Sequence, residues 1–144
     1  EKLPFEDNSI EACYSHMLYC MALTTNDLEK LNNEIQRILK PSGINVYTVR
    51  HTNDGDFKKG VHVGEDLYEN DGFIVHYFSE EKVNSLLKGF KNISIDKFEE
   101  GTFPRKLFFV LSFRLSIRSF EECNSPANLK FLCIRLFVNF FKKV

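Results

Sequence analysis

The chain has 144 residues, of which 43% are hydrophobic and 27% charged, and its formal net charge is −1. These values are typical of one folded domain and exclude an intrinsically disordered chain. Residues 105–144 carry eight Lys and Arg against two Glu, a net charge of +6, which leaves −7 on the first 104 residues. These acidic residues show no basic stripe with interleaved aromatic side chains, the pattern that is typical of nucleic-acid binding.

The first predicted element is a strand over residues 9–15, which follows a turn signal at Asp7-Asn8. Ser15, His16 and Met17 lie at its carboxyl end. A helix is predicted next, because Thr24 to Asp27 supply capping side chains and apolar residues then recur on one helical stripe: Leu28, Leu31, Ile35, Ile38 and Leu39. The helix is expected to stop at residues 40–43, where a proline and a glycine prevent its continuation.

A second strand is predicted over residues 44–49, which are rich in β-branched and aromatic side chains and lead to Arg50 and His51. The strand-helix-strand order predicts parallel neighbours joined by a right-handed crossover. Residues 52–72 contain four glycines among polar residues and show no sustained period, so they are predicted to form a long loop.

A second helix is predicted to begin at Ser79, with Val83, Leu86, Leu87 and Phe90 on its inner stripe. Residues 92–96 alternate as a half-buried strand, and residues 106–113 form an apolar run that suits a strand covered on both faces. We expect these two strands to pair as an antiparallel hairpin.

The last predicted element covers Leu129 to Phe141, an apolar run interrupted by three polar residues. It is shorter than the roughly 20 residues that span a bilayer and it carries charges, so we expect a helix that packs on the domain or on a partner. A minority hypothesis is an interfacial membrane helix with Lys142 and Lys143 at the headgroups.

Two motifs carry a family resemblance: LPFEDNSI, at residues 3–10, and LKPSG, at residues 39–43, in which Ser42 replaces a more usual glycine. At this separation they resemble the middle of a class I S-adenosylmethionine-dependent methyltransferase, and the resemblance extends to about Leu111. It implies an α/β fold with a partial Rossmann-like sheet, two parallel strands plus an antiparallel carboxyl-terminal hairpin, and flanking helices. It also implies S-adenosylmethionine as the cofactor, with Ser15, His16 and Met17 at its methionine and methyl side.

The family's glycine-rich cofactor loop lies before these motifs, and no Gly-x-Gly occurs in this sequence. We therefore expect residues 1–115 to be the carboxyl-terminal part of a methyltransferase domain and residues 116–144 to be an atypical cationic helical extension. The strand at residues 9–15 would then lack a neighbour, and its unpaired edge would invite self-association.

Candidate substrate contacts gather after the predicted strands, since ligands of open α/β sheets bind outside the carboxyl ends of the strands. The candidates are Arg50, Glu65, Tyr68 and His76. His51 and His62 are the candidate general bases, because histidine titrates near neutral pH. For His76, which lies in an apolar run, a packed core histidine is at least as plausible. The histidine spacings match no zinc pattern, so no metal site is predicted.

The four cysteines are spaced neither as zinc ligands nor as a dense disulfide framework, and reduced, buried thiols are expected. No signal peptide is apparent before Leu3, so the cytoplasm is the expected location. Two functions remain open: methyl transfer to a small-molecule acceptor by a domain of which this chain is an incomplete part, and a non-catalytic methyltransferase-like remnant that acts as an interaction module.

Overall fold

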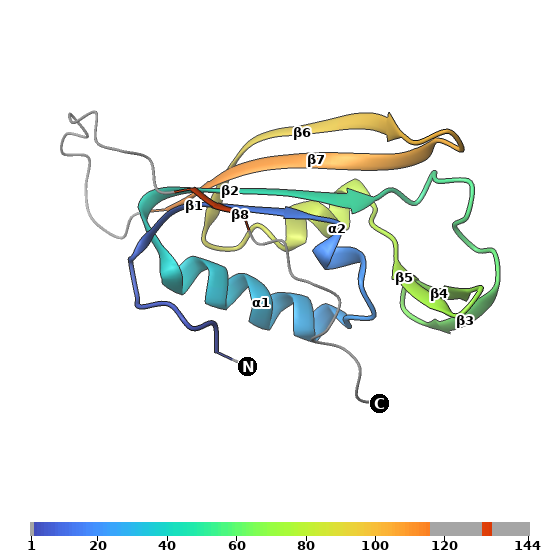
Figure 1. The fold of residues 1–144 in the computed structure, drawn as a ribbon, viewed down its shortest axis with the longest axis horizontal. Helices are drawn as coiled ribbons and strands as arrows, with labels where there is room; N and C mark the ends of the chain where they lie inside the picture. The colour runs from blue at the N-terminus through green and yellow to red at the C-terminus, as the bar shows by residue number, and fades with distance from the viewer. Residues whose placement is uncertain (1, 116–130, 134–144) are drawn as a thin grey trace.

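The computed structural model describes residues 2–115 and 131–133 (Figure 1). Within them, a five-stranded sheet has the order β6-β7-β2-β1-β8, and a separate three-stranded sheet has the order β3-β4-β5. The helices α1 and α2 lie on the same side of the larger sheet, and the small sheet lies beyond the carboxyl end of β2 (Figure 1). The expected α/β fold with a mixed sheet is confirmed.

The predicted strand-helix-strand unit is confirmed as β1 (Ile10–His16), α1 (Thr25–Ile38) and β2 (Leu39–Arg50). β1 and β2 pair in parallel, from Ala12 opposite Ile44 to His16 opposite Thr48. A capping box begins α1, in which Thr24 and Asp27 satisfy each other's backbone N–H groups. The 3-10 turn η1 (Leu18–Cys20) joins β1 to the segment before α1.

β2 begins earlier than predicted, since it starts at Leu39 directly after α1. The register with β1 shifts between Ile10 and Ala12, so that the Pro-Ser-Gly turn is absorbed as a bulge within the strand. Ser42 there has a φ of 62°, and a Cβ added at Gly43 would lie 2.8 Å from the Lys40 carbonyl oxygen. The close backbone approach explains the glycine at this point.

The prediction of a loop over residues 52–72 was wrong in its second half. β3 (Val61–Gly64), β4 (Leu67–Asn70) and β5 (Phe73–His76) form an antiparallel meander there. The β4–β5 turn is Asp71-Gly72, and both residues have positive φ, 52° and 82°. This conformation matches the twist of a tight hairpin, which is why Asp-Gly is favoured in such turns.

The second helix begins as predicted, with the Ser79 hydroxyl accepting from the Lys82 N–H, but α2 is short (Glu80–Ser85). Phe90, which was assigned to the helix stripe, instead opens β6 (Phe90–Glu100). Gly89 adopts a φ of +80° between them, a conformation that ends a helical path. β6 pairs antiparallel with β7 (Arg105–Arg114), and β7 lies between β6 and β2, so the predicted hairpin is confirmed.

β8 (Phe131–Cys133) pairs in parallel with Ala12–Tyr14 of β1. The helix predicted over Leu129–Phe141 is therefore wrong for these three residues, and the unpaired edge expected on β1 is wrong over Ala12–Tyr14. An extended segment satisfies the edge N–H and C=O groups of β1, which a helix could not do. The rest of the predicted 116–144 extension lies outside the described residues.

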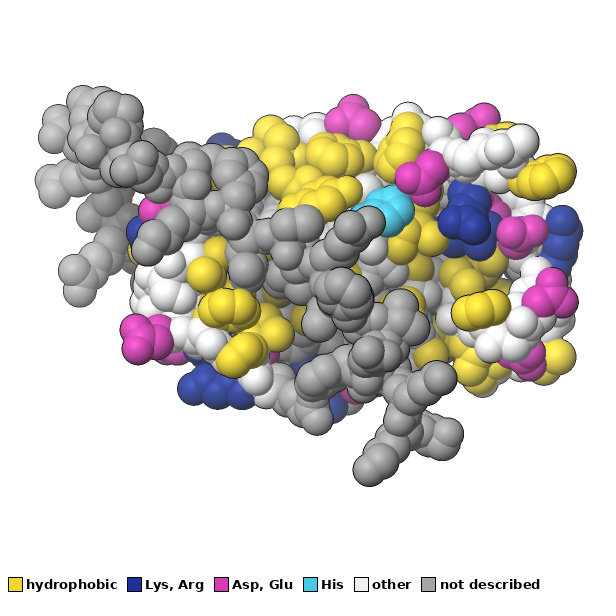
Figure 2. All heavy atoms as spheres, in the orientation of Figure 1, with side chains coloured by type: hydrophobic (Ala, Val, Ile, Leu, Met, Phe, Trp, Pro, Cys, Tyr) yellow, Lys and Arg dark blue, Asp and Glu magenta, His cyan; other side chains and the backbone are white. Residues whose placement is uncertain are grey.

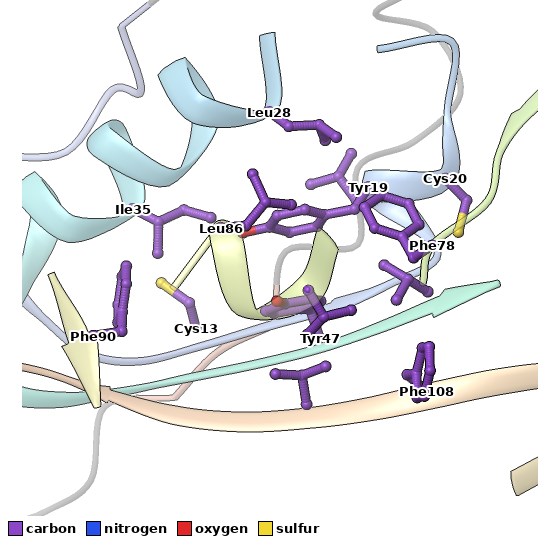
Figure 3. Close-up of a cluster of buried hydrophobic side chains, with 14 of the residues drawn as sticks. Cys13, Tyr19, Cys20, Leu28, Ile35, Tyr47, Phe78, Leu86, Phe90 and Phe108 are labelled. Atoms are coloured by element: carbon purple, nitrogen blue, oxygen red, sulfur yellow. The ribbon is translucent and has the colours of Figure 1, made fainter. Parts of the chain in front are cut away.

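The core lies between the larger sheet and the two helices (Figure 3). The Tyr19 and Tyr47 rings stack with centroids 4.4 Å apart. Asn32 joins three elements here: its Oδ1 accepts from the Tyr19 hydroxyl at 2.6 Å, and its Nδ2 donates to the Leu86 carbonyl oxygen at 2.5 Å. This buried brace fixes η1 and α2 against α1.

Cys13 and Cys20 are buried free thiols, as expected for these two of the four cysteines. Burial raises the pKa of Cys13 to about 11 and that of Cys20 to about 12, so neither is a reactive thiolate near neutral pH. In the described part of the chain no helix is long and apolar enough to cross a membrane.

Asn32→Ala is expected to lower the free energy of unfolding by roughly 2–4 kcal/mol, because it leaves the buried Tyr19 hydroxyl and Leu86 carbonyl without partners. Urea denaturation followed by circular dichroism measures the change. Asn92→Ala, on the exposed side of β6, is the control and should stay within about 0.5 kcal/mol of the parent. Equal losses in the two variants would contradict the brace.

Candidate active site

The carboxyl ends of β1 and β2 carry a connected group of side chains. The Thr48 hydroxyl oxygen accepts from the Met17 N–H at 3.1 Å and lies 2.9 Å from Nδ1 of His16. The carboxylate that faces Nε2 favours the ring proton of a neutral His16 on that nitrogen, and the Thr48 hydroxyl then donates to Nδ1. Nε2 lies 3.5 Å from the Glu100 carboxylate, and both side chains are 42% exposed.

We call His16, Met17, Thr48 and Glu100 the β1 rim. Met17 has a φ of 58° and a ψ of 9°, a left-handed conformation that is uncommon for a residue with a side chain. Such conformations persist where surrounding contacts hold them, and they cluster at binding and catalytic sites. The two hydrogen bonds from the Met17 N–H to the side chain and carbonyl oxygen of Thr48 provide that hold.

Ser15 lies next to the β1 rim and is only 3% exposed. The Ser15 hydroxyl has no hydrogen-bond partner among the described residues. The same is true of the hydroxyl of Tyr47, the residue that pairs with Ser15 on β2. A buried hydroxyl without a partner is costly and is uncommon away from functional sites. The end of β1 therefore retains hydrogen-bonding capacity that residues 2–115 and 131–133 do not use.

His51 lies one residue beyond β2, where a cavity of about 290 Å³ opens between the end of β2 and the β6–β7 hairpin. Its ring stacks on Phe108 with centroids 4.1 Å apart, and its Nδ1 accepts from the Asn53 N–H at 2.7 Å. Burial lowers the pKa of His51, and Lys97 and Lys106 lower it further. The proton of the neutral ring is then on Nε2, so His51 is arranged to donate a hydrogen bond at this nitrogen rather than to accept a proton.

Arg50 makes ion pairs and a cation–π contact with neighbouring residues of the protein. Its Nη2 lies 2.5 Å from Asp54 Oδ1 and 2.8 Å from Asp56 Oδ2, and its guanidinium lies 5.2 Å from the Tyr77 ring centroid. Asp54 also accepts from the Lys106 N–H at 2.7 Å. Arg50 therefore orders the segment after β2 and fastens it to β7.

His62 and Tyr68 lie together on the small sheet, with ring centroids 4.9 Å apart. Nε2 of His62 lies 2.8 Å from the Glu65 carbonyl oxygen, and the histidine is exposed. Tyr68 also meets Phe57 edge to face at 5.4 Å. These residues form a group separate in the fold from the β1 rim.

Glu65 and His76 belong to a polar cluster that joins the small sheet to both helices. Nδ1 of the fully buried His76 donates to the Leu23 carbonyl oxygen at 2.6 Å, and Nε2 lies 2.5 Å from Lys82 Nζ. Lys82 is also 3.5 Å from Glu65, which accepts from the Thr25 N–H at 3.0 Å. We call Glu65, His76 and Lys82, with Leu23 and Thr25, the clasp.

The predicted site residues thus separate into three places. Ser15, His16 and Met17 lie together at the end of β1. Arg50 ends β2, and His51, one residue further, lines the neighbouring cavity. The remaining candidates lie on or beside the small sheet: His62, Glu65, Tyr68 and His76. The sequence analysis missed Thr48 and Glu100. Thr48 shares the face of β2 that carries Val46, which an alternation of side chains along the strand could have indicated, whereas no sequence signal pointed to Glu100. In the described residues, no group of three His, Cys, Asp or Glu is placed to hold a metal ion.

The α/β unit with its mixed sheet agrees with the resemblance to class I S-adenosylmethionine-dependent methyltransferases, and comparison with known proteins confirms that resemblance. Residues 1–47 match the family model of the methyltransferase domain. The chain is 42% identical over 57 residues to the sterol 4-C-methyltransferase strm-1 of Caenorhabditis elegans, a match that covers 39% of this chain and 16% of that protein.

Solved structures show the same fold. An S-adenosylmethionine-dependent methyltransferase from Methanosarcina mazei superposes with a TM-score of 0.65 at 19% identity, over 79% of this chain and 63% of that one. The 1,6-didemethyltoxoflavin-N1-methyltransferase of Burkholderia thailandensis, solved with 1,6-didemethyltoxoflavin and S-adenosylhomocysteine bound, superposes with a TM-score of 0.59 at 12% identity, over 76% of this chain and 46% of that one. The chain therefore spans less than two thirds of the length of these relatives.

The clasp predicts a pH-dependent stability. Burial lowers the pKa of His76 below its ordinary value of about 6.5, and nearby Lys82 lowers it further, while the hydrogen bond to Leu23 and the carboxylates of Glu65 and Asp66 act in the opposite direction. Because the folded protein disfavours the charged ring, the contribution of His76 is fully present above about pH 6.5 and is lost as the pH falls towards the lowered value.

His76→Gln is therefore expected to flatten the loss of unfolding free energy between about pH 7 and pH 5, by up to about 1.4 kcal/mol per pH unit. Urea melts across this range measure the slope. The control His62→Gln, on exposed β3, should keep the parental slope. An unchanged slope in His76→Gln would refute the assignment.

Proposed function

We propose that residues 1–115 are the carboxyl-terminal part of an S-adenosylmethionine-dependent methyltransferase domain, and that the complete domain transfers a methyl group to a small-molecule acceptor. The observation that carries the proposal is the β1–α1–β2 unit, in which the family match coincides with the strand end that carries Ser15, His16 and Met17. A small-molecule acceptor is supported by the names of the relatives, which refer to a sterol and to 1,6-didemethyltoxoflavin.

The residues at the end of β1 fit part of the cofactor. The unpartnered Ser15 hydroxyl and the strained backbone at Met17 offer contacts for the methionine and methyl end of S-adenosylmethionine. The ribose and adenine would need groups from elsewhere in the domain, because these 144 residues contain no glycine-rich loop. Bound there, the cofactor would supply an electrophilic methyl group.

The contribution of this chain's residues to the reaction is mainly alignment. Holding the acceptor in line with the methyl group can be worth effective molarities of about 10⁵ M or more. Thr48 serves this purpose by fixing both His16 and Met17, and Glu100 reaches the same place from the β6–β7 hairpin. Where an acceptor must lose a proton, His51 and His62 remain the proposed bases, although a base role for His51 would require its ring to release the Asn53 N–H.

The isolated chain is expected to bind S-adenosylmethionine more weakly than about 100 μM, since the part that holds the ribose is absent from it. Isothermal titration calorimetry measures this directly. Micromolar affinity of the 144-residue chain would contradict the division of the cofactor site proposed here.

Thr48→Val in a protein that includes the upstream part of the domain should lower kcat/KM by about tenfold or more, because the shape of the side chain is kept while the hydrogen bonds to Met17 and His16 are lost. Steady-state methyl transfer with S-adenosylmethionine and an identified acceptor measures the effect. Thr102→Val, at the exposed β6–β7 turn, is the control and should leave kcat/KM unchanged. Full activity in Thr48→Val would contradict a role of the β1 rim in methyl transfer. If the complete domain transferred a methyl group to no acceptor at all, the non-catalytic alternative would be favoured.

A further inference from the structure

The cavity beside His51 has the composition of a binding site for a small acid. Its lining comprises His51, Asn53, Lys97, Phe98, Glu99, Lys106 and Leu107. Two lysines against one glutamate leave this lining with an excess of one positive charge while His51 is neutral. Its volume of about 290 Å³ is near the lower end for small-molecule pockets, and it lies at the sheet edge where ligands of α/β folds bind.

The orientation of His51 gives the cavity a fixed donor. Nδ1 accepts from the Asn53 N–H, and the ring stacks on Phe108 with an interplanar angle of 30°. Nε2 makes no hydrogen bond to any residue in the described ranges, and in this tautomer it carries the proton. A ligand that enters the cavity therefore meets a preorganised N–H group.

The lysines add donors that can be recruited. Lys97 Nζ lies 3.5 Å from Glu80, but both side chains are more than half exposed, and such surface pairs contribute little and exchange readily. Lys106 faces Glu99 as its Cα partner across the hairpin. On the face that Figure 2 shows, basic and acidic side chains are interspersed at this end of the molecule.

The remaining walls are apolar. Phe98 and Leu107 line the cavity and are Cα partners in adjacent strands, and Phe108 backs the imidazole. Of these side chains Phe98 is exposed, so a ligand made only of charge would leave its ring in water, whereas one with an apolar body would cover it.

We propose that this cavity binds a small molecule that joins a carboxylate to a compact apolar body, with the carboxylate held by Nε2–H of His51 and by Lys97 and Lys106. The statement that this ligand is the methyl acceptor rests on the proposed function; the binding itself does not. A carboxylate on this side of β2 would leave the rest of the acceptor to extend towards the end of β1, the neighbouring strand.

The test uses benzoate as the probe with the whole chain, in the absence of S-adenosylmethionine, followed by nuclear magnetic resonance of labelled histidine rings. Benzoate should shift the His51 signals saturably, and benzamide, which has the same shape without the charge, should bind about tenfold more weakly or worse. Inorganic phosphate, a charge without an apolar body, should also be at least about tenfold weaker. Equal binding of benzamide or of phosphate would overturn the ligand class.

Variants locate the site. Lys106→Gln and Lys97→Gln should each weaken benzoate by about threefold or more in the same His51 titration, while Lys91→Gln, on the same hairpin but outside the cavity lining, should not. Thermal melts check that each variant is folded. Parental affinity in Lys106→Gln and Lys97→Gln would overturn the proposal. Because no cofactor or turnover enters these measurements, failure of methyl transfer in the complete domain leaves their result unaffected.

Discussion

The parallel pairing of β1 with β2 is the constraint on which the site and most of the core depend. In-register pairing from Ala12–Ile44 to His16–Thr48 places the two strand ends at one edge. Only with this register does the Thr48 hydroxyl reach both His16 and Met17, since a slip of one residue would turn the hydroxyl to the opposite face. The position of the crossover helix α1 depends on the same pairing, because its Leu28, Ile35 and Ile38 are buried in the cluster that also contains Tyr47 and Val49 of β2.

Hydrogen bonding gives three of the histidines, His16, His51 and His76, different roles. His76 uses both ring nitrogens inside the fold, and His51 uses one. His16 is bonded to Thr48 at Nδ1 and faces a carboxylate at Nε2. In each case the partner of one nitrogen decides what the other can do, so neighbouring backbone groups matter as much as the ring itself.

The sequence predicted those parts of the fold that carry strong local signals. The Thr24 capping box, the apolar stripe of α1 and the β-branched run of β2 each agree with the structure. The small sheet escaped prediction because its strands have four residues each, too few for a period to be recognised, although Asp71-Gly72 is a hairpin signal. Phe90 satisfied the helical period, yet the backbone at Gly89 redirects the chain into β6.

The candidate site was less accessible to sequence reasoning. The strand ends at Ser15, His16 and Met17 could be expected from the α/β pattern together with the family motifs. The contacts that define their chemistry could not, because Thr48 and Glu100 reach His16 across 32 and 84 residues of chain, distances over which no periodicity operates. Lys82 lies six residues from His76 in the chain, but their contact depends on how α2 docks beside the small sheet, which the sequence pattern did not show.

The pairing of residue 12 with residue 131 affects the order in which the protein can assemble during synthesis. β1 is synthesised before the segment that covers its outer edge, and the other strands of the larger sheet are made in between. Contacts between such distant segments form slowly, so the pairing of β1 with β8 is expected late in folding. Until then this edge is open to chaperones that recognise unpaired strands.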